Sequence, residues 1–293
     1  MTNVSPRSML WALRLLVVAV APTLAFAVDG ATEQRGEPAA TVATAAWGVV
    51  VAVVLVALVA PSPLGLTVTR SALPLLVPGA IAALVLGADP AWGVAALALA
   101  LLATLVAFTA ESAEAFVQAA AYGDEQRLPL RVPAALLPPM VLSWMVWAAV
   151  ALAAVLALCA GAWLPGGALA VVTGVLAVPL FRRLHRFSRR WLVIVPAGVV
   201  LHDHVVLADT LLIMRPNVAM ARLAPATTEA ADFTGPAAGH AVELTVREMV
   251  LAVRGPTPTE PKGKALHVQS LLVAPSRPGR ALRALAAAKV PVG

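Results

Sequence analysis

Five polar residues within ten positions are the best candidates in this chain for a site with chemistry. The carboxylates could transfer protons, the guanidinium groups could bind an anionic group, and the set includes the only tyrosine. The residues are Tyr122, Asp124, Glu125, Arg127 and Arg131. A solvated turn with a local ion pair explains the same residues, and no known catalytic motif has this spacing. Two interpretations therefore stay open, a polar surface site and an ordinary turn.

A second charged group follows the last long apolar segment of the chain. It holds five arginines within nine residues, namely Arg182, Arg183, Arg186, Arg189 and Arg190. Basic side chains beside an anionic leaflet are attracted to it by about 1 kcal/mol each. The same run is also an ordinary signal for the orientation of a membrane helix. We expect these arginines to contact anionic lipids, with or without recognition of a particular lipid.

The segment His202–His204 could suggest a metal ion, because its two histidines would face the same side of a strand. A catalytic metal needs a third firm ligand, and no spacing supports His240 or His267 in that role. A polar hairpin turn explains the segment more simply. The sequence also lacks a glycine-rich phosphate loop, a nucleophile elbow and a pair of catalytic carboxylates. We therefore expect no metal, no cofactor and no enzymatic activity.

The composition indicates that these polar groups belong to a membrane protein. Of the 293 residues, 60% are hydrophobic and 12% are charged, and the mean hydropathy is +0.88. A bilayer can bury that much apolar surface, whereas a soluble core of this size cannot. The long apolar runs predict six membrane-spanning helices at Met9–Val28, Ala39–Ala60, Ser71–Ala88, Ala91–Ala110, Leu137–Ala160 and Gly166–Phe181.

The first and third expected spans have features of their own. Arg7 and Arg14 precede the apolar part of the first, which ends in small residues, so it is either a retained helix or a cleaved signal peptide. Pro74 and Pro78 predict a kink in the third.

Few charged residues are expected inside the membrane. We place Arg70 and Asp89 in loops, and Arg14 lies near enough to a helix end to reach the interface. Ion-coupled transport needs ionisable groups within the bilayer, so this pattern weakens a transporter interpretation.

The charges of the short loops predict the orientation. Residues 29–38, the loop near Asp89 and residues 164–165 together contain one basic residue, Arg35. The other side would hold ten, namely Arg7, Arg14, Arg70, Arg127, Arg131 and the five arginines of the run. Positive charge marks the cytoplasmic side, so we expect both termini in the cytoplasm of a cell with this protein in its inner (plasma) membrane. The net charge of +6 is therefore explained without nucleic acid.

Beyond residue 190 the pattern changes to that of short strands. We predict strands at 191–195, 199–202, 205–214 with a break at 209–210, 218–223, 241–246, 249–253 and 266–273, and a helix at 280–290. Seven strands and a terminal helix is the order of a pleckstrin-homology-like barrel, and an unassigned small β-sandwich or barrel is the alternative. The expected organisation is a transmembrane bundle at 1–181 with a cytoplasmic loop at 111–136, a basic juxtamembrane hinge at 182–190 and a cytoplasmic β-rich domain at 191–293.

Two stretches also carry a resemblance. Ala121–Arg131 and Arg186–Asp203, the latter continuing through Val206–Thr210, are similar to an uncharacterised family of actinobacterial multi-pass membrane proteins. The resemblance would cover most of the chain and implies no activity. It implies that the central loop and the strand after the basic run are fixed features of such proteins.

Three hypotheses of function follow. The leading one is a non-enzymatic scaffold or adaptor, whose cytoplasmic domain binds a protein partner at the anionic membrane surface. The alternatives are a transporter or lipid-handling protein that uses the six-helix bundle, and a membrane-bound enzyme that uses residues 122–131.

Overall fold

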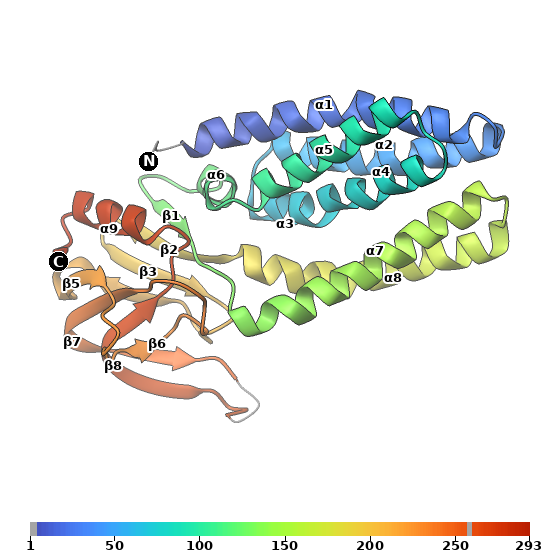
Figure 1. Cartoon of the computed structure of the whole chain (residues 1–293). Helices are drawn as coiled ribbons and strands as arrows, with labels where there is room; N and C mark the ends of the chain where they lie inside the picture. The colour runs from blue at the N-terminus through green and yellow to red at the C-terminus, as the bar shows by residue number, and fades with distance from the viewer. Residues whose placement is uncertain (1–4, 257–259) are drawn as a thin grey trace. The chain divides into compact units, whose positions relative to one another are not determined.

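The computed structural model describes residues 5–256 and 260–293 (Figure 1). The chain divides into two compact units, a helical unit of residues 1–116 and 140–185 and a β unit of residues 117–139 and 186–293. The chain therefore passes between the units three times along its length.

Within the described residues, six helical segments are long and apolar enough to cross a membrane, which indicates a multi-pass membrane protein. They agree with the six predicted spans. The helices that form them are α1 (Pro6–Thr32), α2 (Glu37–Val59), α3 (Pro63–Ala72) with α4 (Leu76–Val85), α5 (Pro90–Ala107), α7 (Leu137–Cys159) and α8 (Trp163–Ser188). The short helix α6 (Ala110–Ala119) is not one of the candidate spans. The third span consists of α3 and α4 joined by a 3-10 turn at Leu73–Leu75, so the α-helix is interrupted at Pro74, one of the two prolines from which a kink is predicted, while Pro78 lies within α4.

Several helices begin at a polar residue followed by proline. The side chains of Ser5, Ser62 and Asp89 accept hydrogen bonds from backbone N–H groups of the first turn, and the next residue is proline in each case. The side-chain oxygen satisfies a donor that has no partner inside the helix, and proline has no N–H to satisfy. These residues fix where α1, α3 and α5 start.

Three arginines in the helical unit bind carbonyl groups at helix ends. Arg14 donates from Nε and Nη2 to the carbonyl of Leu58 in α2, at 3.1 and 2.8 Å. Arg70 donates to the carbonyls of Ala107, the last residue of α5, and of Thr109 just after it, at 3.0 and 3.2 Å. A cation at a helix C-terminus satisfies carbonyls that lack a partner and opposes the negative end of the helix dipole. Arg35 acts in the same way after α1 and α4.

Arg70 differs from its predicted place in a loop. It lies in the last turn of α3, within the third candidate span, because α3 already starts at Pro63. The sixth span is also longer than predicted, because α8 continues through the basic residues as far as Ser188. Most of the expected hinge is therefore helical.

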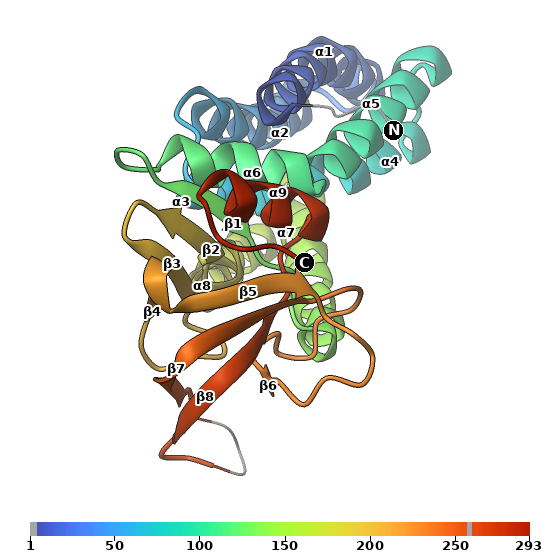
Figure 2. The same cartoon turned by 90° about the vertical axis from the view of Figure 1, so that its left-hand side faces the viewer.

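The β unit contains two four-stranded sheets among its described residues, with strand orders β1-β2-β3-β4 and β5-β7-β8-β6 (Figure 2). Neighbouring strands are antiparallel, except that β6 runs parallel to β8. The elements are β1 (Gln126–Pro129), β2 (Arg190–Val195), β3 (Gly198–Asp203), β4 (Leu211–Met214), β5 (Val218–Leu223), β6 (Ala231–Asp232), β7 (Val242–Arg254), β8 (Lys264–Val273) and α9 (Pro278–Ala287).

One core holds the β unit together. Alternate residues of both sheets point into it, and α9 adds Ala281, Ala284 and Leu285. Gly198 is needed in the β2–β3 hairpin, because a Cβ there would lie 2.1 Å from the carbonyl oxygen of Ile213 on β4. Most of the predicted strands appear, and 241–246 and 249–253 are joined into the single strand β7 across an irregularity between Thr245 and Val250. The prediction at 205–214 is wrong in its first half, because residues 204–206 form a turn in which the N–H of Val205 donates to Asp203, and only Leu211–Met214 is a strand, β4. The short strands β1 and β6 were not predicted.

Candidate functional site

The central loop contributes a strand to the β unit. Residues Gln126–Pro129 pair antiparallel with Trp191–Ile194 of β2, and Leu128 and Leu130 enter the core. We expected this loop to belong with the helices, whereas residues 117–139 fold with the β unit. The polar candidate residues therefore lie at one edge of the first sheet.

Gln118 closes the turn before β1. Its amide donates to the carbonyl of Glu125 at 2.9 Å and accepts from the backbone N–H of Arg127 at 2.8 Å. Glu125 forms an ion pair with Arg127 at 2.5 Å, and its carboxylate accepts from the N–H of Tyr122 at 2.6 Å. The Tyr122 side chain is 89% exposed, and Asp124 is exposed as well. These contacts are those of a polar turn with a local ion pair.

Arg131, the fifth predicted residue, belongs to a different network. Its backbone N–H donates to Ala274 at 2.8 Å, and its guanidinium donates to the carbonyl of His240. Burial lowers the pKa of Arg131 from its ordinary value. The five predicted residues thus divide into a turn at 122–127 and a separate, half-buried contact at Arg131.

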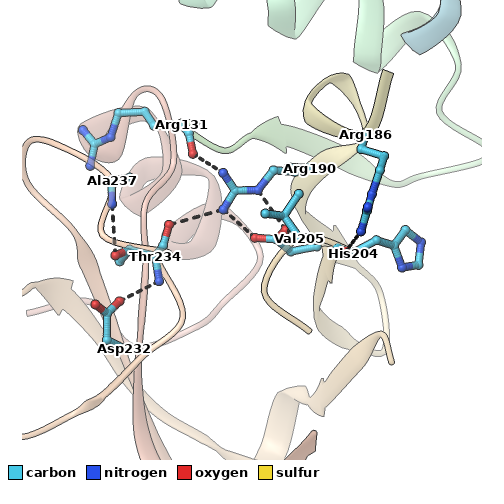
Figure 3. Close-up of polar contacts among 9 residues, drawn as sticks. Arg131, Arg186, Arg190, His204, Val205, Asp232, Thr234 and Ala237 are labelled. Carbon is cyan, nitrogen blue, oxygen red and sulfur yellow. Dashed lines mark hydrogen bonds and ion pairs between the residues drawn. The ribbon is translucent and has the colours of Figure 1, made fainter. Parts of the chain in front are cut away.

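The carbonyl of Arg131 accepts from the guanidinium of Arg190, which is the centre of this second network (Figure 3). Arg190 donates from Nε to Oδ1 of Asp203 at 2.8 Å and from Nη2 to Oδ2 at 2.7 Å. Both side chains are fully buried, with an exposed fraction of 0%. The Nη2 group also donates to the carbonyl of Thr234 at 3.3 Å, and Oδ1 of Asp203 accepts from Val205 at 3.0 Å.

The pair links four segments that are distant in sequence. These are the end of β1, the start of β2, the end of β3 and the loop after β6, where Thr234 is held by Asp232 at 2.7 Å. A buried bidentate pair is tolerated when its other hydrogen-bonding groups are also satisfied, as here. Removal of one partner from such a pair costs about 3–5 kcal/mol. The network therefore fixes how β1 and the 232–237 loop join the first sheet.

The arginine run is divided by this burial. Arg190 is inside the β unit, whereas Arg182, Arg183, Arg186 and Arg189 are exposed. Arg186 also donates to the carbonyl of His204 at 3.1 Å (Figure 3). Lipid contact thus stays a prediction for the four exposed arginines. The Arg190 side chain is buried in its ion pair with Asp203.

An aromatic column lies on β2 and β3, on the opposite face from the Arg190 pair. The rings of Trp191 and His202 stack with centroids 4.9 Å apart, and the ring of His204 meets His202 edge-on at 4.4 Å. The guanidinium of Arg127 lies 5.3 Å from the Trp191 ring, a cation–π contact. Arg127 therefore contacts both Glu125 of the turn and Trp191 of this column.

His202 is neutral at ordinary pH. Burial, and then electrostatic interactions with His204, Arg189 and Arg127, lower its pKa to about 4. Its Nδ1 lies 3.2 Å from Thr210 Oγ1, and Nε2 is buried without a partner among the described residues. A general base works best with a pKa near the operating pH, so this imidazole is poorly suited to acid–base catalysis.

The His202–His204 segment does not gather a metal site among the described residues. The two histidines do contact each other, as their i, i+2 spacing suggested. Asp203 faces the other way and is fully engaged by Arg190, so its carboxylate is not available to them.

Comparison of the chain with models of known protein families, with curated proteins and with solved structures found no match. The similarity to an actinobacterial membrane-protein family therefore stays a prediction, and a function has to be inferred from the geometry.

Proposed function

We propose that this protein is a multi-pass protein of the inner (plasma) membrane that acts as a non-enzymatic adaptor. Its β unit would lie in the cytoplasm and bind a protein partner at the membrane surface. The observation that carries the proposal is strand β1, which brings the segment between α6 and α7 into the first sheet. An appended domain usually hangs on one linker and moves freely. Here three chain connections join the sheet to the helices, which suits a domain that must be held in place.

We also propose that the β unit is a variant of the pleckstrin-homology-like barrel. Two sheets that share one core, followed by a helix packed on that core, support this assignment. The described strands depart from the seven-strand order in two ways. The long strand β7 takes the place of two predicted strands, and β1, from the segment before α7, and the two-residue β6 are additions.

Charge supports the proposed orientation and the contact with lipid. The exposed Arg182, Arg183, Arg186 and Arg189 follow the apolar part of α8, where they would meet the headgroups of an anionic leaflet. With both termini cytoplasmic, α1 would be a retained span rather than a signal peptide.

The state of the polar groups supports a binding role over catalysis. Arg190 and Asp203 satisfy each other, Glu125 is paired with Arg127, and His202 has a pKa far below neutrality. Activated groups in enzymes are instead arranged around a space for substrate.

Purification of the tagged full-length protein from mild detergent tests the proposal. We expect a stoichiometric partner with the unchanged protein and with Asp209→Ala, a change at an exposed aspartate. The partner should be lost with Asp203→Ala, which breaks the buried pair of the β unit. Repeated recovery of the protein alone, or equal recovery of the partner with both variants, would contradict an adaptor that binds through this unit.

A further inference from the structure

An apolar cavity of about 170 Å³ lies inside the helical unit, between α1, α2, α4 and α7. Its walls are almost wholly aliphatic and include Leu24, Val50, Leu76 and Val155. Apolar cavities do not hold water well, because water finds no hydrogen-bond partners there. All four helices belong to candidate membrane spans, so a hydrocarbon chain is the occupant that the surroundings supply.

One end of the cavity is polar. Its lining reaches Arg35 just after α1, Leu86 just after α4 and Cys159 at the end of α7. The cavity therefore extends to the end of the helical unit where α1 turns into α2. A chain that enters it would keep its head at that end.

Arg35 has hydrogen-bonding capacity left at this end. Its Nη1 donates to the carbonyls of Ala31 and Leu86, the latter at 2.8 Å. Among the described residues nothing accepts from its Nε or Nη2, and neither Glu33 nor Glu37 forms an ion pair with it. Guanidinium groups bind phosphate well, and the two carboxylates nearby in sequence suit a cation.

Trp47 gives a second, independent indication. It lines the cavity, and its indole N–H is buried without an acceptor among the described residues. A buried donor without an acceptor is costly, so an acceptor brought by a ligand would be favourable. An ester carbonyl at the top of an acyl chain is such an acceptor.

We propose that this cavity binds one acyl chain of a phosphatidylethanolamine-type lipid. The phosphate would lie at Arg35 and the ammonium group would face Glu33 and Glu37. This inference does not depend on the adaptor function, because it concerns the helical unit alone.

Photo-crosslinking tests the proposal with the full-length protein in phosphatidylcholine vesicles. The probes are phosphatidylethanolamine and phosphatidylglycerol that carry a diazirine in one acyl chain, and mass spectrometry locates the adducts. We expect the phosphatidylethanolamine probe to label residues 43–50 and 148–159 more strongly than the phosphatidylglycerol probe does. Arg35→Gln should lower that labelling by about fivefold, the effect of one basic group near a headgroup.

Gly79→Leu provides a variant that fills the cavity. Gly79 is part of the lining, and a Cβ at this position would meet nothing within 4 Å. We expect the leucine to reduce the labelling of residues 43–50 and 148–159 several-fold. Gly174→Leu on α8 is the matched control, because a Cβ there also meets open space but the residue is not part of the lining.

Labelling that follows the exposed faces of α7 and α8 and ignores Gly79→Leu would mean ordinary surrounding lipid and would overturn the site. Stronger labelling by phosphatidylglycerol would overturn the headgroup assignment. Cys159 allows a measurement on the unchanged protein, because it is the only cysteine and lines the cavity. In detergent, added phosphatidylethanolamine should slow its alkylation by a maleimide several-fold, and an unchanged rate would count against the proposal.

Discussion

The ion pair of Arg190 and Asp203 lies in the interior of the β unit, with both side chains fully buried. Both charges are removed from water, so each depends on the other and on the carbonyls of Arg131 and Thr234. A buried charge that loses its partner keeps its desolvation cost and loses the compensating attraction.

Asp203→Ala should therefore destabilise the β unit by about 3–5 kcal/mol, because it leaves Arg190 charged and unpaired. The double change Arg190→Leu with Asp203→Leu should cost clearly less, because no buried charge is left. Chemical unfolding of the full-length protein in detergent, followed by hydrogen exchange in β2 and β3, measures both. Asp209→Ala is the control at an exposed site. Equal losses for the single and the double variant would show that the charges do not depend on each other.

The pKa of His202 gives a dependence on pH. The folded protein holds this pKa at about 4, below the ordinary value of 6.5, because burial and nearby positive charge disfavour the protonated form. As the pH falls from 6.5 to 4, the unfolded chain binds a proton at this position and the folded protein does not. The contribution of His202 to stability is thus fully present above pH 6.5 and is lost as the pH falls towards 4.

His202→Phe should remove this part of the pH dependence while it keeps a ring stacked on Trp191. The measurement compares the unfolding midpoints of the variant and the unchanged protein between neutral pH and pH 4. His267→Phe, a change at an exposed histidine, serves as the control. A difference between His202→Phe and the unchanged protein that does not vary with pH would refute the assignment.

The buried pair could have been predicted from the alternation of the two strands, but the run of five arginines favoured an exposed basic patch instead. Arg190 is in phase with Leu192 and Ile194, which point into the core, and Asp203 is in phase with Leu201. A two-residue hairpin at 196–197 places Arg190 directly opposite Asp203. Strand phase and hairpin register together predict an inward ion pair, whereas five neighbouring arginines suggest one exposed patch.

At the scale of elements, long periodic segments were predictable and short ones were not. The six spans appear where their hydropathy predicts them, because a run of about twenty apolar residues has the length of a helix that crosses the bilayer. Strand β1 has four residues and includes Pro129, so its alternation is too short to recognise. It forms because β2 offers an edge and because Leu128 and Leu130 fill the core. Tertiary packing decides such strands.

Leu128→Ala should accordingly release β1 from the sheet. Truncation of a buried leucine costs about 2–5 kcal/mol, and Leu128 is the residue of β1 that enters the core. We expect faster amide exchange at residues 126–129 and 191–194, with little change in the second sheet. Leu212→Ala on β4 is the matched control, because Leu212 is 48% exposed and lies outside the core. Unchanged exchange at 191–194 would mean that β1 adds nothing to the sheet.

For the whole molecule, the distribution of charge and the chain path support the same arrangement. The chain passes into the β unit after α6, returns to the helices at α7 and passes into the β unit again after α8. All three connections must therefore be on one side of any membrane that the helices span. The basic residues are concentrated on this side, and the turn between α1 and α2 on the other side is acidic apart from Arg35. The positive-inside rule therefore supports the proposed cytoplasmic location of the β unit.

Labelling of single cysteines tests this orientation. In a Cys159→Ser background, Glu33→Cys and Asp209→Cys place a thiol at an exposed residue of the α1–α2 turn and of the β unit. A maleimide that does not cross membranes should label the Glu33→Cys variant in intact cells. It should label Asp209→Cys only after permeabilisation, because the inner membrane otherwise separates the reagent from the β unit. The background protein controls for labelling elsewhere. The reverse pattern would place the four exposed arginines outside the cell, and the proposed contact with the cytoplasmic leaflet would fail with it.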